Sequence, residues 1–294
     1  MRANAPAPAF DTHHDTKEET TRMHGTVSVT RGKKLTIHTY TAPELGWRAN
    51  THIIELPNEL VLFDAQLTPA LAREVVTIAN ALGKPITRLY ISHAHPDHFA
   101  GATEIDAPTY ALASVQKLIN RSGDLRIERG YQYTPGHGDA ETITSRPIDH
   151  AVEAGEEVID GVRFSFEPVK DAETTEQLAI GFPDEDIVIA PDVLYNGVHL
   201  FIGEHAFDAW EAAIARLEAR PYNIILPGHG LPGGRSIYDA QRAYLAVARE
   251  AFAEANGPED LNNRLEAAFP EFGGSAMQGL QNFYLYPEPA STEN

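Results

Sequence analysis

The sequence predicts an α/β fold in which helices pack outside sheet layers. Short β-prone runs separated by turn residues follow one another over residues 26–63, which is typical of a strand meander. Helical and strand-like segments then alternate, an order that places helices on the outer face of a sheet. In addition, the apolar strand expected over 86–91 ends directly in a cluster of histidines and an aspartate, so a functional site is expected at a strand end.

The elements of the first third follow from these patterns in order. Residues 1–24 are rich in Ala, Pro, Thr, Asp and Glu and predict a flexible N-terminal arm. Apolar residues at helical spacing predict a helix over 69–82, before the largely buried strand 86–91. β-prone residues dominate four earlier runs, which are expected to be strands: 27–30, 35–40, 53–56 and 60–63.

The rest of the chain is expected to contain a long loop, a hairpin, and further strands and helices. The Gly-rich, aromatic stretch 122–147 lacks a clear period and predicts a long loop of the kind that forms lids. Asp160-Gly161 is a strong turn dipeptide and predicts a hairpin. Further strands are expected over 109–112, 156–159, 162–166, 178–182, 187–190 and 223–226. Helices are expected over 99–106, 114–120 and 236–255, around Trp210, and after residue 258.

Composition narrows the classes of function. Of the 294 residues, 23 are Lys or Arg and 42 are Asp or Glu, a net charge of 23 − 42 = −19. Such a surface repels phosphate backbones and argues against a nucleic-acid partner. The absence of cysteine excludes disulfides and thiolate metal sites. No apolar run approaches the ~20 residues that span a membrane, and the N-terminus lacks an apolar signal core, so we expect a cytoplasmic protein without a membrane partner.

The stretch after strand 86–91 carries metal-binding chemistry. Imidazole nitrogen and carboxylate oxygen are ligands for zinc, and also for iron or manganese. His93 and His95 alternate by two, so on an extended segment they point to one side and can share a metal. Asp97 and His98 are adjacent beyond Pro96 and can serve a second metal once the chain turns.

This run from His93 to His98 resembles the H-x-H-x-D-H signature of the metallo-β-lactamase fold superfamily. The resemblance spans roughly residues 25–240. It implies a four-layer αββα sandwich with the site at strand ends between two sheets. Residues 25–240 are therefore assigned to a catalytic domain, and 241–294 to a C-terminal helical extension packed on that domain.

The resemblance also implies ligands farther along the chain. Asp192 follows a strand where the family carries the aspartate that bridges both metals, and His229 lies between two glycines where the family has its last ligand. Asp64 follows an apolar strand at the position whose carboxylate supports the histidine loop from beneath. Alternatively, Asp64 caps the helix that begins near Thr68.

One family ligand is missing, because no histidine precedes strand 178–182. The matching position is Glu173, and a carboxylate can replace imidazole since Zn–O and Zn–N bonds have similar lengths. The substitution resembles the alkylsulfatase branch, in which Glu is the ligand here. Asp171 and Glu176 are close alternatives, and the stretch can also be read as an acidic loop without a metal.

The implied site holds two divalent metal ions, with zinc as the first expectation and manganese or iron as alternatives. One ion is assigned to His93, His95 and Glu173; Asp192 bridges it to the second ion. The ligands of the second ion are Asp97, His98 and His229. A hydroxide between the metals would attack the substrate, and Asp97 would orient it.

Three further residues are candidates for contact with substrate. The lactonase branch carries a Tyr near Tyr195, where its hydroxyl can bond the substrate carbonyl or leaving oxygen; a packed aromatic is the alternative. His137 and His199 are candidates for facing the substrate.

The expected function is hydrolysis of an ester, lactone or related bond in a small molecule. The alternatives are a sulfate-ester hydrolase, a β-lactamase, a thioesterase, or a non-catalytic binding module of the same fold. The aromatic C-terminal tail would pack in the core, cover the mouth of the site or form a homodimer face.

Overall fold

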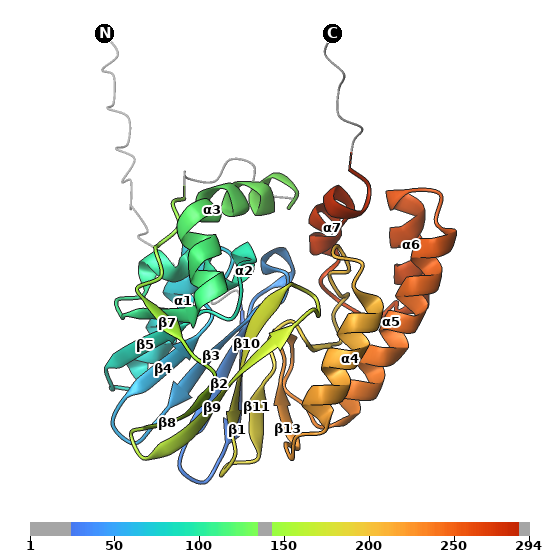
Figure 1. Ribbon diagram of the computed structural model, residues 1–294. Coiled ribbons are helices and arrows are strands. Elements are labelled where there is room, and N and C mark those ends of the chain that lie inside the picture. Colours follow the sequence, from blue (N-terminus) through green and yellow to red (C-terminus); the bar gives the residue numbers. More distant parts are fainter. Residues whose placement is uncertain (1–24, 135–142, 288–294) are drawn as a thin grey trace, which may run out of the picture.

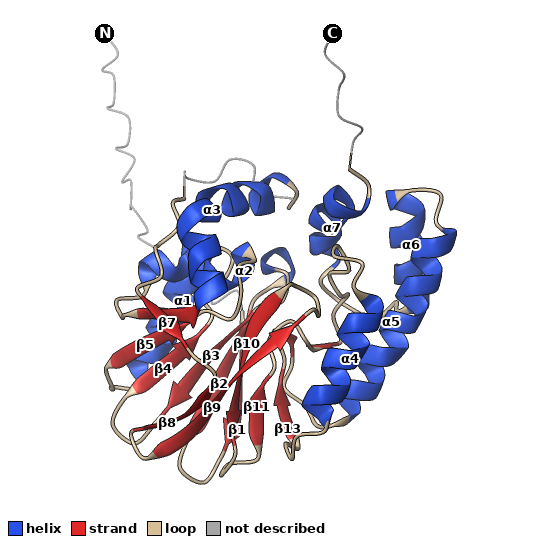
Figure 2. Ribbon diagram, viewed as in Figure 1, coloured by secondary structure: helices blue, strands red, loops and turns tan. Residues whose placement is uncertain are grey.

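Two β-sheets lie face to face at the centre of the molecule, and helices cover both outer sides (Figure 1). Figure 2 shows the strands gathered between the two groups of helices. This computed structural model describes residues 25–134 and 143–287. The arrangement confirms the four-layer αββα sandwich that the sequence predicts.

The first sheet has seven strands in chain order, β1 to β7. Its strands are antiparallel up to β4 and parallel from β4 to β7. Since parallel strands end at the same edge, the loops that follow β4 and β5 meet there. The strands are β1 Thr26–Arg31, β2 Thr36–Thr41, β3 Asn50–Glu55, β4 Leu60–Phe63, β5 Ile86–Tyr90, β6 Thr109–Leu112 and β7 His150–Val152.

The second sheet has the order β13-β11-β10-β9-β8, in which only β11 and β13 are parallel. A separate parallel pair joins β12 to β14 and sets Tyr195 opposite His229. The strands are β8 Gly155–Ile159, β9 Val162–Lys170, β10 Glu176–Phe182, β11 Ile187–Ile189, β12 Tyr195–Asn196, β13 Ile224–Leu226 and β14 His229–Gly230.

The helices fall into two groups (Figure 1). The first group is α1 Pro69–Ala81, α2 Pro96–Phe99 and α3 Ala113–Gln132. The second is α4 Phe207–Glu218, α5 Ser236–Glu254, α6 Pro258–Ala268 and α7 Gln278–Leu285. Short 3-10 turns are η1 Glu44–Gly46, η2 Ala100–Glu104 and η3 Ser275–Met277. In the part of the chain that is described, no helix combines the length and apolar character needed to cross a membrane.

The expected loop over 122–147 is wrong in its first part, because α3 continues to Gln132. Ser122 interrupts the helical geometry without ending the helix. Two glycines weaken the helical pattern in the sequence, but both serve close packing. A Cβ on Gly123 would lie 2.5 Å from the Ser145 hydroxyl oxygen, and one on Gly130 would lie 2.7 Å from Pro96 Cγ. The helix expected over 99–106 is likewise shorter, a 3-10 turn after α2.

Direct hydrogen bonds join the two sheets at the edge where the histidine loop lies. The backbone N–H of Leu178 in β10 donates to the carbonyl of Ser92, at 2.9 Å. From β3, the Asn50 side chain donates to the carbonyls of Pro227 and Gly230, at 2.8 and 2.7 Å. Loops that are distant in sequence are therefore fixed against one another.

The C-terminal helices pack on the sandwich through aromatic rings. Phe269 and Phe272 stack on Tyr244 of α5. Phe283 of α7 stacks on Tyr133, with ring centroids 4.7 Å apart. The C-terminal residues thus contact both α5 and the end of α3.

Candidate metal centre

Seven buried or nearly buried side chains converge where the two sheets meet. They form two overlapping groups, and within each group one ligand atom per residue lies within 4.8 Å of all the others. The first group is His93, His95, Glu173 and Asp192; the second is Asp97, His98, Asp192 and His229. Asp192 belongs to both, so its carboxylate lies between the two positions.

Local chain geometry explains how the first group assembles. His93 and His95 follow β5, and Glu173 lies at the tip of the tight β9–β10 loop, which the Asp171 N–H closes by donating to the Thr175 carbonyl. His95 Nδ1 is 2.9 Å from Glu173 Oε1, and His93 Nε2 is 3.7 Å from Glu173 Oε2.

The two alternatives to Glu173 lie elsewhere. Asp171 is exposed, and Glu176 accepts a hydrogen bond from Ser114 and pairs with Lys170. Neither belongs to either group of candidate ligands in the described residues.

The second group is tighter. Asp97 Oδ2 lies 3.0 Å from His98 Nε2 and 3.2 Å from His229 Nε2. Asp192 completes it, with Oδ1 3.3 Å from His98 Nε2 and Oδ2 3.2 Å from His229 Nε2. His229 follows Pro227 and Gly228, which come directly after β13.

The donor atoms fit divalent cations. Buried polar atoms in proteins are normally hydrogen-bonded, yet several of these atoms have no hydrogen-bond partner among the described residues, and all belong to the two groups. They are His93 Nε2, Asp97 Oδ2, His98 Nε2, Asp192 Oδ1 and both carboxylate oxygens of Glu173. A mixed set of imidazole nitrogens and carboxylate oxygens suits zinc, manganese or iron.

The charge of the cluster also fits divalent cations. Four carboxylates are buried together: Asp64, Asp97, Glu173 and Asp192. Burial raises the pKa of Glu173 to about 7. Burial opposes the charged form of His229, but Asp192 and Asp97 raise its pKa to about 10. Buried carboxylates need compensating positive charge, and two divalent cations would supply it.

A further set of hydrogen bonds fixes the histidine rings. Asp64 accepts from the backbone N–H of Ser92 (2.7 Å), from the Ser92 hydroxyl (2.8 Å) and from His98 Nδ1 (2.8 Å). The same hydroxyl accepts from His93 Nδ1 at 2.9 Å. These bonds turn Nε2 of both rings toward the centre. The helix cap that was the alternative for Asp64 is made by Thr68, whose side chain accepts from the Leu71 N–H.

Two further features support this set, and only the second was indicated by the sequence. His229 Nδ1 donates to the backbone carbonyl of Trp47 at 2.8 Å. Gly228 lies so close to Asp192 that a Cβ would be 2.0 Å from its Oδ1. A backbone carbonyl leaves no signal in a sequence, whereas the Gly on each side of His229 did indicate close approach.

Tyr195 is buried against the bridging carboxylate. Its hydroxyl donates to Asp192 Oδ2 at 2.7 Å, and its ring stacks on His229 with centroids 4.6 Å apart and planes 4° apart. The single phenolic proton is thus directed at Asp192, and the ring is also packed near Trp210. The structure adds a positioning contact that sequence reasoning did not anticipate.

His199 does not belong to the centre. His199 is buried beside Tyr244, with Nδ1 3.0 Å from its hydroxyl, and packs near Phe272. It does not line the pocket described below. His137 lies outside the described residues.

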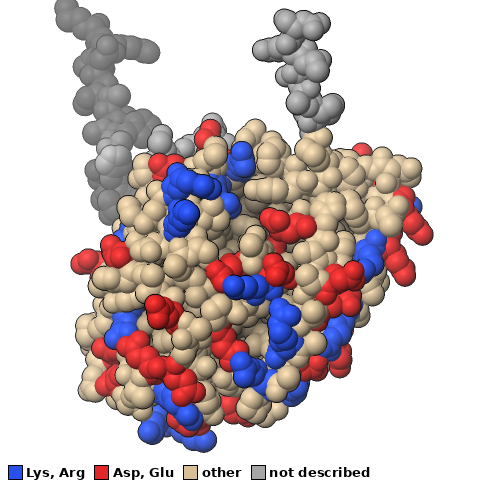
Figure 3. Space-filling model, viewed as in Figure 1, with Lys and Arg blue, Asp and Glu red and all other residues tan. Residues whose placement is uncertain are grey.

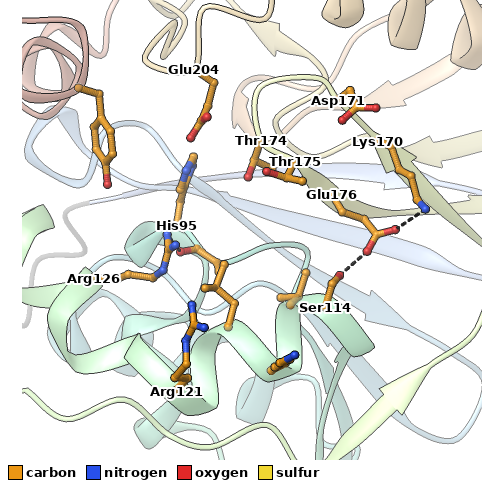
Figure 4. A pocket seen from close by; sticks show the side chains of 15 residues that line it. His95, Ser114, Arg121, Arg126, Lys170, Asp171, Thr174, Thr175, Glu176 and Glu204 are labelled. Carbon is orange, nitrogen blue, oxygen red and sulfur yellow. Dashed lines mark hydrogen bonds and ion pairs between the residues drawn. The ribbon is translucent and has the colours of Figure 1, made fainter.

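A pocket of about 460 Å³ opens beside His95 (Figure 4). His95 is the most accessible of the four histidines, at 15% exposed, whereas His93, His98 and His229 are 0% exposed. The pocket therefore reaches the candidate metal centre from the side of His95.

Comparison with known proteins shows the family to which the chain belongs. Residues 46–229 match the family described as the Metallo-beta-lactamase superfamily. A metallo-beta-lactamase type 2 from Bacillus sp. (strain 170) is 23% identical over 229 residues, covering 72% of this chain and 80% of that protein. The uncharacterized protein YobT from Bacillus subtilis (strain 168) is 32% identical over 93 residues, which cover 30% of this chain and 39% of YobT.

Solved structures show the same fold. The metallo-beta-lactamase FIM-1 from Pseudomonas aeruginosa, in its mono-zinc form, superposes with a TM-score of 0.57 at 18% identity. The match covers 78% of this chain and 98% of FIM-1. About a fifth of the present chain therefore lies outside the region shared with FIM-1.

Proposed function

The chain belongs to the metallo-beta-lactamase superfamily, and from that premise we propose that it is a dinuclear hydrolase of small-molecule esters or lactones. His93, His95 and Glu173 would hold one cation. The second cation would be held by Asp97, His98 and His229, with Asp192 shared between the two. Zinc is proposed as the metal, in keeping with the donor set and with the mono-zinc form of FIM-1.

The observation that carries this proposal is the convergence of unpartnered, buried donor atoms from loops of both sheets. Leaving a buried polar atom without a partner costs about 1–3 kcal/mol, and here six such atoms share one place. A cation at each position would satisfy all six.

The cations, when bound, would polarise a substrate oxygen and acidify a water molecule. The residues of the chain would do the rest. Asp97 Oδ2 faces His98 and His229 and is proposed to orient the attacking water and accept its proton. Tyr195 would hold Asp192 in place through its 2.7 Å hydrogen bond. His95, the candidate ligand that lines the pocket, marks where the scissile bond would lie.

Ester or lactone hydrolysis is proposed because Tyr195 lies three residues after Asp192, and the lactonase branch of the superfamily carries a Tyr near this point. A second candidate, sulfate-ester hydrolysis, is favoured by Glu173 at the position of the third histidine. A panel of a 4-nitrophenyl ester, a γ-lactone, 4-nitrophenyl sulfate and the β-lactam nitrocefin separates these activities. Turnover of the sulfate ester or nitrocefin alone would overturn the proposed substrate class.

Metal analysis tests the site itself. We expect about two cations per chain in the purified protein and about one in Glu173→Gln, because the first group would lose its only unshared carboxylate. Glu176→Gln is the matched control. It removes the same charge three residues along the chain, and the Glu176 side chain contacts Ser114 and Lys170 instead of the candidate centre. Absence of metal from the wild-type protein, even after incubation with zinc or manganese, would instead support a non-catalytic binding module.

A further inference from the structure

The pocket beside His95 has a basic wall. It is formed by α3, where Lys117, Arg121 and Arg126 line the cavity. Figure 4 shows Arg126 next to His95 and Arg121 farther along the same helix. The opposite wall is the β9–β10 loop, which also carries Glu173. The basic wall thus lies next to the candidate metal centre.

The three basic side chains of this wall lack counter-ions in the described residues. Lys117 and Arg121 make neither a hydrogen bond nor an ion pair with any described residue, and Arg126 bonds only the Ala94 carbonyl, at 3.2 Å. Arg126 Nε is buried without a partner. By contrast, Lys170 across the pocket pairs with Glu176.

Several other arginines of the described residues do have counter-ions. The chain carries a net charge of −19, so carboxylates are abundant, and other arginines such as Arg163 and Arg264 have two acidic partners each. Figure 3 shows Lys and Arg side chains gathered beside a hollow in the drawn face, over the region of α3. Burial lowers the pKa of Arg126, Tyr284 and Glu204 act in the opposite direction, and Arg129 and Arg121 add weaker repulsion.

Acidic groups on the rim form no ion pair with this wall in the part of the chain that is described. Asp171 and Glu204 line the same pocket, but both are exposed. Neither lies within ion-pair distance of Arg121 or Arg126 in the described residues. Between the charged groups, Val115, Leu118 and Tyr284 supply apolar surface suited to a short carbon chain.

We propose that the basic wall of Lys117, Arg121 and Arg126 binds an anionic oxygen group, such as a carboxylate, on the hydrolysed substrate. This inference rests on the proposed function and narrows it to anionic esters or lactones. A guanidinium binds carboxylate, sulfate or phosphate oxygens through paired hydrogen bonds. A pocket of about 460 Å³ has the size of a small-molecule site. The apolar residues would contact the carbon chain between the anion and the scissile bond.

Two matched pairs of esters test the proposal with the metal-loaded protein. Mono-4-nitrophenyl glutarate and 4-nitrophenyl pentanoate differ in a terminal carboxylate on the acyl side. 4-Acetoxybenzoate and 4-acetoxytoluene differ in a carboxylate on the alcohol side. We expect the anionic member of one pair to have a kcat/KM at least about tenfold higher, since a charge-assisted hydrogen bond supplies roughly that factor.

Arg121→Gln should lower this anionic-to-neutral ratio by about tenfold. Arg129→Gln is the matched control, because it removes the same charge from the same helix, where the guanidinium lies over Phe283 and outside the pocket. The control should leave the ratio unchanged. A preference for the neutral member in both pairs, or equal ratios in wild type and Arg121→Gln, would overturn the proposal.

If no ester is hydrolysed, the proposed function fails and binding alone decides this inference. Glutaric acid monoanilide and its neutral analogue N-phenylpentanamide carry an amide in place of the ester. In titration calorimetry, tighter binding of the anionic anilide to wild type than to Arg121→Gln would support the basic wall as an anion site. Equal affinities would refute it.

Discussion

Replacing Gly228 with alanine tests whether the bridging carboxylate must lie where the structure places it. Gly228 is held from both sides: its N–H donates to the carbonyls of Pro191 and Leu194, and its own carbonyl accepts from the Asn50 N–H at 2.7 Å. Because these bonds fix the backbone, an added methyl group cannot move away easily. The methyl group would instead displace the Asp192 side chain.

The size of the effect follows from three distances. The new Cβ would lie 2.0 Å from Asp192 Oδ1, 2.8 Å from the carbonyl carbon of Pro191 and 3.0 Å from the Asp192 nitrogen. Since non-bonded contacts settle at about 3.5 Å, Oδ1 would have to move by about 1.5 Å. A 1 Å displacement of a reacting group costs about 10²-fold in rate. We therefore expect kcat/KM to fall by about 10²-fold or more.

The assay combines kcat/KM on the best ester of the panel with metal content by elemental analysis. Gly234→Ala is the matched control, because its Cβ would meet nothing closer than the Asn223 carbonyl at 3.8 Å. We expect the control to stay within about twofold of wild type, the range of substitutions that strain nothing. A folded Gly228→Ala protein with wild-type metal content and activity would refute the assigned role of Asp192.

Three other predictions concern the surroundings of the centre. Asp64→Asn should weaken metal affinity by about 10–100-fold, because His98 Nδ1 and the Ser92 hydroxyl lose a shared acceptor. Asn tolerates the positive φ of 65° at this position, so unchanged affinity in a metal titration would contradict the hydrogen-bonding role. Tyr195→Phe keeps the ring on His229 but removes the bond to Asp192, and should lower metal affinity by about tenfold; a loss in kcat alone, with affinity intact, would assign the hydroxyl to the substrate instead. Chelation of the metal should lower the midpoint of thermal unfolding by about 5–10 °C, the effect of losing ligand that was present at about 100 times its Kd, and an unchanged midpoint in calorimetry would argue against bound cations.

The part of the site that lies in one short stretch could be predicted from the residues themselves. His93, His95, Asp97 and His98 follow a buried strand, so spacing alone aims them at a common region. Asp192 and His229 were reached only through the family resemblance, because no local pattern brings together residues about a hundred positions apart. The choice among Asp171, Glu173 and Glu176 depends on how the β9–β10 loop closes, a property of the folded hairpin.

Most strand and helix positions were also predictable, but α3 was not. Its buried residues recur every fourth position, from Val115 through Ile119 to Ile127 and Tyr131, and that spacing was the available signal. Glycine and serine propensities pointed to a loop, whereas packing against Pro96 and Ser145 stabilises the helix. Because the second half of α3 was read as a loop, Arg126 was not placed on the same helix as Lys117.

The candidate ligands are divided between the two sheets: the histidine loop follows β5, while Glu173, Asp192 and His229 belong to loops of β9–β10, β11 and β13. A chain in which only one layer has formed offers an incomplete coordination sphere and would compete poorly for scarce cations. Metal capture would then mark the completion of folding. In the native protein, bound cations would make any opening that separates the layers rarer, while fraying of the edge strand β1 would continue as before.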